Sequence, residues 1–181
     1  MKTWVTLGAA VLLLLLGAVA ASCKDGKGGG LSLEEYFQKL DSIQEQADAT
    51  FATQEASTGE PSQDASGEEL AAFLRDTVTS SADVLRDAAA DVNDLEPPDE
   101  VADAHSDIVA AINDLVAAFD DMAGSVPDTL TLAELENAGE TFFNSTELNA
   151  ADEQFVAACN ALEAIATEND ITVDLACEEE E

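Results

Sequence analysis

Four side chains could act as nucleophiles or bind a soft metal ion, and they are Cys23, His105, Cys159 and Cys177. Cys159 and Cys177 lie too far apart for the Cys-x-x-Cys pattern of reactive redox pairs, and a zinc site would need further His or Cys ligands. No serine or cysteine has an evident neighbouring base, and the glycine run after residue 27 precedes no strand–helix unit that could hold a phosphate. The sequence therefore predicts no catalytic residue, no metal site and no cofactor.

His105 is the single histidine, and it is the natural candidate for acid–base catalysis. On a helix, Asp103 and Asp107 would point to other faces, whereas the neighbours one turn away are the apolar residues Val101, Ile108 and Val109. We therefore expect a half-buried structural histidine. A hydrolase that uses His105 with nearby carboxylates is the alternative.

Carboxylates are too abundant for spacing alone to identify a catalytic pair. We interpret Asp120 with Asp121, and Glu134 with Glu136, as solvated helix faces. The chain contains no Asp-x-Asp-x-Asp-Gly loop of the kind that binds calcium.

Residues 144–146 have the Asn-x-Ser/Thr pattern of a glycosylation acceptor. A hydroxyl just before an apolar periodic segment is also the usual cap of a helix. We expect Ser145 or Thr146 to cap the last helix.

Cys23 follows an uncharged apolar run over residues 7–21 that is preceded by Lys2. The run is shorter than the ~20 residues that a membrane-spanning helix needs, and it has the layout of a secretory signal. It ends in AASC at residues 20–23, which resembles the lipobox of bacterial prolipoproteins, with alanine where leucine is commonest. An uncleaved membrane anchor, or an ordinary signal peptide with an accidental cysteine, is the alternative.

The resemblance implies that the Cys23 sulfur carries a diacylglyceryl group and that cleavage between Ser22 and Cys23 makes Cys23 the mature N-terminus. The protein would then lie outside the cytoplasm, anchored to the cell membrane through diacylglyceryl-Cys23. We expect residues 1–22 to be the lipoprotein signal peptide, 23–31 the lipidated cysteine and tether, 32–177 a helical bundle domain and 178–181 an acidic tail.

The segment KDGKGGG after Cys23 cannot hold a helix, because glycine costs about 1 kcal/mol per helical position. As a flexible coil these residues would span about 15 Å. Lys24 and Lys27 would be attracted to anionic lipid headgroups. The sequence therefore predicts a tether at this position.

The chain is strongly acidic, with a formal net charge of −33. All but one of its 39 acidic residues follow residue 30, where the only basic residues are Lys39, Arg75 and Arg86. Nucleic acid is an unsuitable partner because binding it requires Lys and Arg to neutralise phosphates. The acidity is typical of a solvated surface that maintains solubility, of adaptation to high salt, or of a surface that collects divalent or polyvalent cations.

Apolar residues recur at helical spacing through most of the domain. Capping boxes are expected at Ser32 with Glu35 and at Ser66 with Glu69. A polar loop is expected at 56–66 and a stop at Pro97-Pro98, with helices from 32, 66 and 99, then 132–143 and about 147–168. The fold class is therefore all-α, an antiparallel helical bundle of four long helices plus one short helix.

The last apolar residues, Ile171, Val173 and Leu175, alternate with polar ones, which predicts an extended segment. If Cys23 is lipidated, Cys159 and Cys177 are an even number outside the cytoplasm, which favours a disulfide. An extended chain that turns at 169–170 can run back along the helix far enough to reach Cys159. We expect this bridge to link the tail to the last helix.

Three segments also resemble uncharacterised acidic helical lipoproteins of Chloroflexota and related bacteria: LSLEEYFQKLDSI, LEPPDEVADAHSDIVAAI and CNALEAIATENDITVDLAC. That resemblance implies a fold and a location but no known activity. We expect a membrane-tethered, non-enzymatic envelope, binding or interaction module with a protein or cationic ligand of unknown identity. A surface protein that binds divalent cations or polycations is the alternative.

Overall fold

The computed structural model describes residues 30–59, 61, 62, 64–173, 175 and 177 of the chain. These residues form five α-helices and one 3₁₀ turn, η1, and no β-strand occurs among them. The expected all-α class, with four long helices and one short one, is confirmed. The elements are α1 (Leu33–Thr58), α2 (Gly67–Asn93), η1 (Asp99–Val101), α3 (Ala102–Ser125), α4 (Leu132–Phe143) and α5 (Thr146–Glu168).

Both predicted capping boxes are present. At α1 the Glu35 N–H donates to Ser32 Oγ at 3.3 Å, and the Ser32 N–H donates back to the Glu35 carboxylate at 3.0 Å. Ser66 and Glu69 repeat this exchange at α2. Each box satisfies two of the backbone donors that a helix start leaves unpaired, so the sequence alone fixes where these helices begin.

The end of α1 differs from the prediction, because the helix continues to Thr58 and the polar loop is shorter than 56–66. The hydroxyls of Ser57 and Thr58 donate to the Gln54 carbonyl at 2.8 and 2.7 Å, so these residues extend the last turn. Gly59 then ends the helix at φ 61°, a conformation that glycine adopts without strain.

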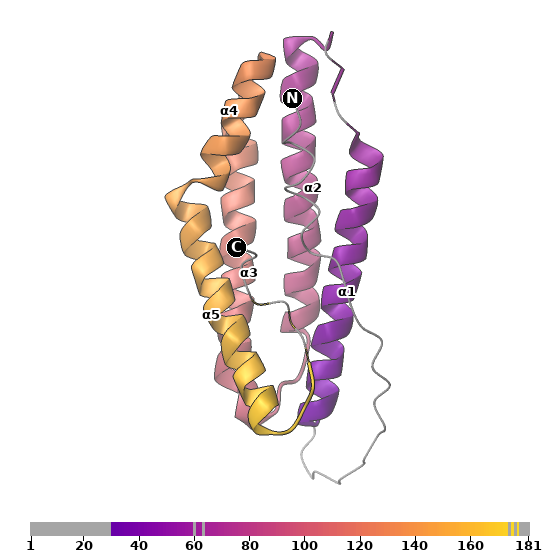
Figure 1. The fold of residues 1–181 in the computed structure, drawn as a ribbon, viewed down its shortest axis with the longest axis vertical. Coiled ribbons are helices and arrows are strands. Elements are labelled where there is room, and N and C mark those ends of the chain that lie inside the picture. Colours follow the sequence, from indigo (N-terminus) through magenta and orange to yellow (C-terminus); the bar gives the residue numbers. More distant parts are fainter. Residues whose placement is uncertain (1–29, 60, 63, 174, 176, 178–181) are drawn as a thin grey trace.

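The four long segments run alternately up and down, as expected for an antiparallel bundle (Figure 1). α1 packs on α2, α2 on α3, and α3 on α5, while α4 packs on the upper part of α2. α4 and α5 run in the same direction as successive segments of one broken helix. The expected stop at Pro97-Pro98 is confirmed, since α2 ends at Asn93 and η1 begins directly after Pro98.

Buried side chains form two clusters, one in each half of the bundle. The upper core joins α2 and α4 and consists of Leu70, Ala71, Leu74, Val78, Leu130 and Leu135. The lower core joins α1, α2, α3, α5 and the tail; its largest members are Tyr36, Phe37, Leu40, Ile108, Ile112, Leu162 and Leu175.

The tail after α5 turns and runs back between α5 and α1 (Figure 1). The turn is a Schellman motif, in which the Ile171 N–H donates to the Ala166 carbonyl at 2.9 Å and the Asp170 N–H to the Thr167 carbonyl at 3.2 Å. Ile171 and Val173 pack against the lower core, and Leu175 and Cys177 are buried in it. The apolar residues of the expected alternation, Ile171, Val173 and Leu175, therefore all contribute to the lower core.

Candidate functional site

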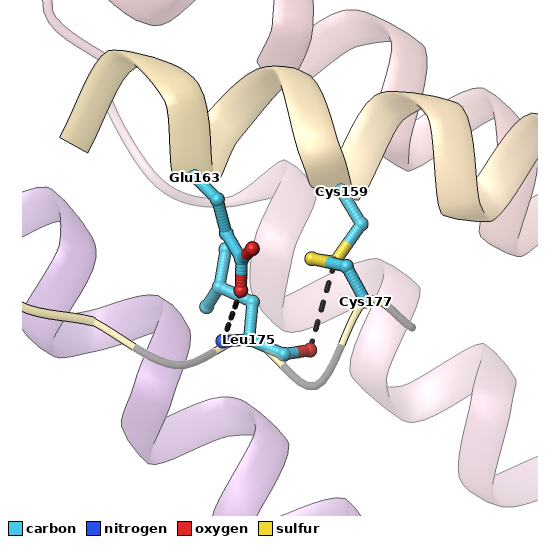
Figure 2. Close-up of a disulfide and its surroundings, with 4 residues drawn as sticks. All are labelled: Cys159, Glu163, Leu175 and Cys177. Atoms are coloured by element: carbon cyan, nitrogen blue, oxygen red, sulfur yellow. Dashed lines mark hydrogen bonds between the residues drawn. A yellow bond between two sulfur atoms is a disulfide. The ribbon is translucent and has the colours of Figure 1, made fainter. Parts of the chain in front are cut away.

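The Cys159–Cys177 disulfide is present and lies in the lower core, as predicted. The two Cα atoms are 5.4 Å apart, and both residues are 2% exposed. Cys159 is in the middle of α5, so the bridge attaches the tail to that helix (Figure 2). Burial on this scale keeps the sulfurs away from thiols in solution, which is typical of a structural disulfide.

A second link between the tail and α5 was not predicted. The Leu175 N–H donates to Glu163 Oε1 at 3.0 Å, and the carboxylate reaches across from α5 beside the disulfide (Figure 2). The Leu175 carbonyl oxygen lies 3.6 Å from Cys159 Sγ, a van der Waals contact because a disulfide sulfur carries no hydrogen. Glu163 is four residues after Cys159, on the same helix face, which is the one sequence signal that could have identified it.

His105 lies in α3 with its ring against the tyrosine of α1. Tyr36 Oη is 3.1 Å from His105 Nδ1, and the two rings meet edge to face. Tyr36 is 0% and His105 8% exposed, so the histidine is buried rather than half-buried. The expectation that apolar residues surround His105 is confirmed by the burial of Val101 and Ile108 in the same core.

The Tyr36–His105 pair has the chemistry of a structural contact. Burial raises the pKa of the Tyr36 hydroxyl far above its usual range and lowers the pKa of His105 below 6.5. At neutral pH the Tyr36 hydroxyl therefore donates to a neutral imidazole, whose proton is on Nε2. Sequence analysis missed Tyr36 as the partner of His105.

The carboxylates singled out in the sequence have separate structural roles. Glu134 completes a third capping box, and its hydrogen bonds from the Thr131 N–H and hydroxyl lower the pKa of that carboxyl. Asp121 and Glu136 are exposed. Within the described ranges, no three His, Cys, Asp or Glu side chains are arranged to hold a metal ion.

Asp120 takes part in an ion pair between helices. Arg86 of α2 donates to the Asp120 carboxylate of α3 at 3.0 Å and also pairs with Asp83 on its own helix. The pair is exposed, so it contributes little stability by itself, although it offsets repulsion between two acidic helices. Arg75 donates to the Val126 and Pro127 carbonyls at 3.1 and 3.3 Å, which ties α2 to the loop before α4.

Neither of two depressions on the surface of the bundle is lined by His105 or a cysteine. An open depression of about 400 Å³ lies beside the loop before α2 and is lined by Pro61, Ser62, Asp64, Ala65, Glu69 and Phe73. A smaller one of about 50 Å³ lies between α1 and α2. Neither depression therefore brings the candidate chemical residues together.

Ser22 and Cys23, the predicted cleavage and lipidation residues, lie outside the described residues, as do most of the tether and the 178–181 tail. The described chain enters the bundle at its lower end, where the Leu31 N–H donates to the Glu96 carbonyl at 3.2 Å. A Cβ on Gly30 would lie 3.4 Å from the same carbonyl oxygen. The segment that leads to Cys23 therefore departs next to the α2–α3 connection.

Among the helices that the structure describes, none is both long enough and apolar enough to cross a membrane. The chain matches no known family model, and no curated protein or solved structure is significantly similar to it.

Proposed function

We propose that the protein is an extracytoplasmic lipoprotein, in which acylated Cys23 holds a non-enzymatic helical bundle at the membrane surface as an interaction module. The proposal combines the AASC lipobox of residues 20–23 with three properties of the folded domain: a buried disulfide, the position where the chain enters the bundle, and the charge of its surface.

The disulfide is the observation that carries the proposal. Disulfides persist in oxidising compartments and are rare in the cytosol of most cells, where thiol reductants keep cysteines reduced. Cys159 and Cys177 form a buried bridge that completes the lower core. A core that depends on a bridge favours a protein that folds after export, which is the fate that a lipobox implies.

The entry of the chain at Leu31 supports attachment at one end of the bundle. The Leu31–Glu96 hydrogen bond fixes this entry beside the α2–α3 connection. α1 then runs for 26 residues, or about 39 Å, to the opposite end, where the loops before α2 and α4 lie. With Cys23 in the membrane, the far loops would be presented to partners in the surrounding space.

The distribution of charge favours a bundle that stands away from the membrane surface on its tether. All but one of the 39 acidic residues follow residue 30, whereas Lys24 and Lys27 lie in the tether. An anionic membrane surface would attract the tether and repel the bundle, over a distance that depends on ionic strength. The same field attracts basic partners, so a protein with a basic surface is the kind of ligand that fits best.

Mass spectrometry of the N-terminal peptide from membrane-extracted protein tests the anchor. We expect a diacylglyceryl adduct on Cys23, and we expect globomycin, which blocks lipoprotein signal cleavage, to cause accumulation of the precursor. Trp4 is the only tryptophan, so the cleaved protein should show only the emission of Tyr36, its single tyrosine.

Two variants make the test specific. Cys23→Ala should abolish both the adduct and the effect of globomycin. The double variant Cys159→Ser/Cys177→Ser removes the other cysteines and should still be lipidated. An unmodified thiol at Cys23 in membrane-extracted protein would overturn the proposal.

A further inference from the structure

The joint between α4 and α5 contains the single Asn-x-Ser/Thr sequence of the chain, and its three residues have different structural roles. Ser145 is the helix cap, because its Oγ accepts the Leu148 N–H at 3.2 Å. Thr146 is the first residue of α5 and is exposed. One hydroxyl is enough to cap the helix, so capping explains Ser145 and leaves Thr146 unexplained.

Asn144 is also exposed, and it ends α4. Its side-chain Nδ2 donates one hydrogen to the Glu140 carbonyl at 2.7 Å. A carboxamide nitrogen carries two hydrogens. The second hydrogen can therefore be replaced by another group while the hydrogen bond to the Glu140 carbonyl is kept. The backbone at Ser145 is extended, with φ −71° and ψ 146°, so the acceptor sequence lies across a break between helices.

The preceding residue, Phe143, is 52% exposed, although it is a large apolar side chain. Phe142, next to it, is buried and packs edge to face on Phe119, so the exposure of Phe143 does not result from a loosely packed joint. The apolar face of a sugar ring attached at the neighbouring position could cover the Phe143 ring and remove apolar area from water. The joint between α4 and α5 lies at the lateral edge of the bundle in the view of Figure 1.

We propose that Asn144 is an N-glycosylation site, with Thr146 as the hydroxyl residue of the acceptor sequence and Phe143 as the surface on which the first sugar rests. The proposal rests on the proposed function, since the modification requires export. The donor is an oligosaccharide linked to a polyprenyl diphosphate. A bond forms between Asn144 Nδ2 and the anomeric carbon, the bond from that carbon to the diphosphate oxygen breaks, polyprenyl diphosphate leaves with the electron pair, and the amide loses one proton to a base of the transferase.

The test is the mass of the peptide that contains Asn144, from protein extracted from membranes of its source organism. We expect a mass increase that corresponds to a series of sugar residues, and we expect Asn144→Gln and Thr146→Val to abolish it. Thr146→Ser keeps an acceptor hydroxyl and should keep the modification. Ser145→Ala removes the helix cap but leaves the acceptor sequence intact, so it should lose stability and remain modified.

The outcomes separate this proposal from the anchor. A bare Asn144 in protein whose Cys23 carries the lipid overturns glycosylation and leaves the lipoprotein proposal standing. A glycan on Asn144 with an unmodified Cys23 supports glycosylation and overturns the anchor. A mass increase that survives Thr146→Val but is lost in Ser145→Ala would show that helix structure, rather than the acceptor sequence, determines the modification, and this would overturn the proposal as stated.

Discussion

The hydroxyl of Tyr36 in α1 lies 3.1 Å from Nδ1 of His105 in α3, across 69 residues of sequence. α1 packs mainly on α2, and α3 packs on α2 and α5. The hydrogen bond therefore joins two helices across the lower core. Both side chains are buried, and each satisfies a polar atom of the other. The single histidine of the chain is therefore explained as part of the core.

Replacing Tyr36 with phenylalanine should lower the free energy of unfolding by about 1–2 kcal/mol, because the buried His105 Nδ1 then loses the hydroxyl that donates to it. The double variant Tyr36→Phe/His105→Phe should lose less than the sum of the single variants, since no polar atom is left unpaired. Urea unfolding followed by circular dichroism at 222 nm measures all four proteins. Additive losses would contradict a direct interaction.

Stability should decrease in mildly acidic solution because of His105. Burial lowers its pKa below 6.5, so the folded protein binds this proton less readily than the unfolded chain. The contribution of the neutral imidazole is complete above pH 6.5 and is lost as the pH falls from there toward the folded pKa. His105→Asn keeps a hydrogen-bond acceptor but does not titrate, so the free energy of unfolding of the natural protein should fall relative to this variant as the pH is lowered below about 6.5. Parallel profiles would show that His105 does not titrate differently on folding.

Removing the disulfide should destabilise the domain by about 3 kcal/mol in the chain-entropy model, whether by reduction or in Cys159→Ser/Cys177→Ser. Release of the tail would also break the hydrogen bond from the Leu175 N–H to Glu163. Hydrogen exchange at the Leu175 amide is therefore a local measurement: we expect protection in the oxidised protein and fast exchange after reduction.

Glu163→Gln is the matched control for this measurement, because an amide oxygen can still accept the Leu175 N–H while the disulfide stays intact. Its Leu175 amide should remain protected. Equal protection before and after reduction would mean that the tail keeps its place without the disulfide, through apolar packing and the hydrogen bond to Glu163.

Local interactions made much of the fold predictable. The boxes Ser32–Glu35 and Ser66–Glu69 join residues three positions apart, so sequence spacing is enough to find them. The Cys159–Cys177 bridge was predictable because the helix and the returning tail have matching lengths. The predicted end of α1 was wrong because Ser57 and Thr58, which are common in loops, here donate their hydroxyl hydrogens to a backbone carbonyl of the helix.

Contacts between distant segments were not predictable. Helical spacing placed His105 among apolar neighbours of its own helix, but it does not say which residue of another helix, here Tyr36, meets it. The Arg86–Asp120 ion pair was not predictable either, because any of the many exposed carboxylates could have been the partner of Arg86. Glu163 belongs to this group as well: its spacing from Cys159 places it on the same helix face, but does not show that its partner is the backbone amide of Leu175.

Replacement of Asp170 with glycine should make the domain more stable. It follows the end of α5 in the left-handed region, with φ 58°, and is the only residue other than glycine with positive φ in the described part of the chain. This conformation costs an L-residue free energy that glycine avoids, and the carboxylate also lies unfavourably at the negative end of the helix dipole. Asp170→Gly should therefore raise the free energy of unfolding by about 0.5–1 kcal/mol after the larger entropy of glycine in the unfolded chain is included. Asp170→Asn removes only the charge, whereas Asp170→Ala keeps the backbone strain. In urea unfolding we therefore expect the glycine and asparagine variants to have a higher free energy of unfolding than the natural protein, and the alanine variant to have the lowest. If the alanine variant equals the glycine variant, the turn does not require positive φ, and the Schellman motif at Ala166–Ile171 is not what reverses the tail.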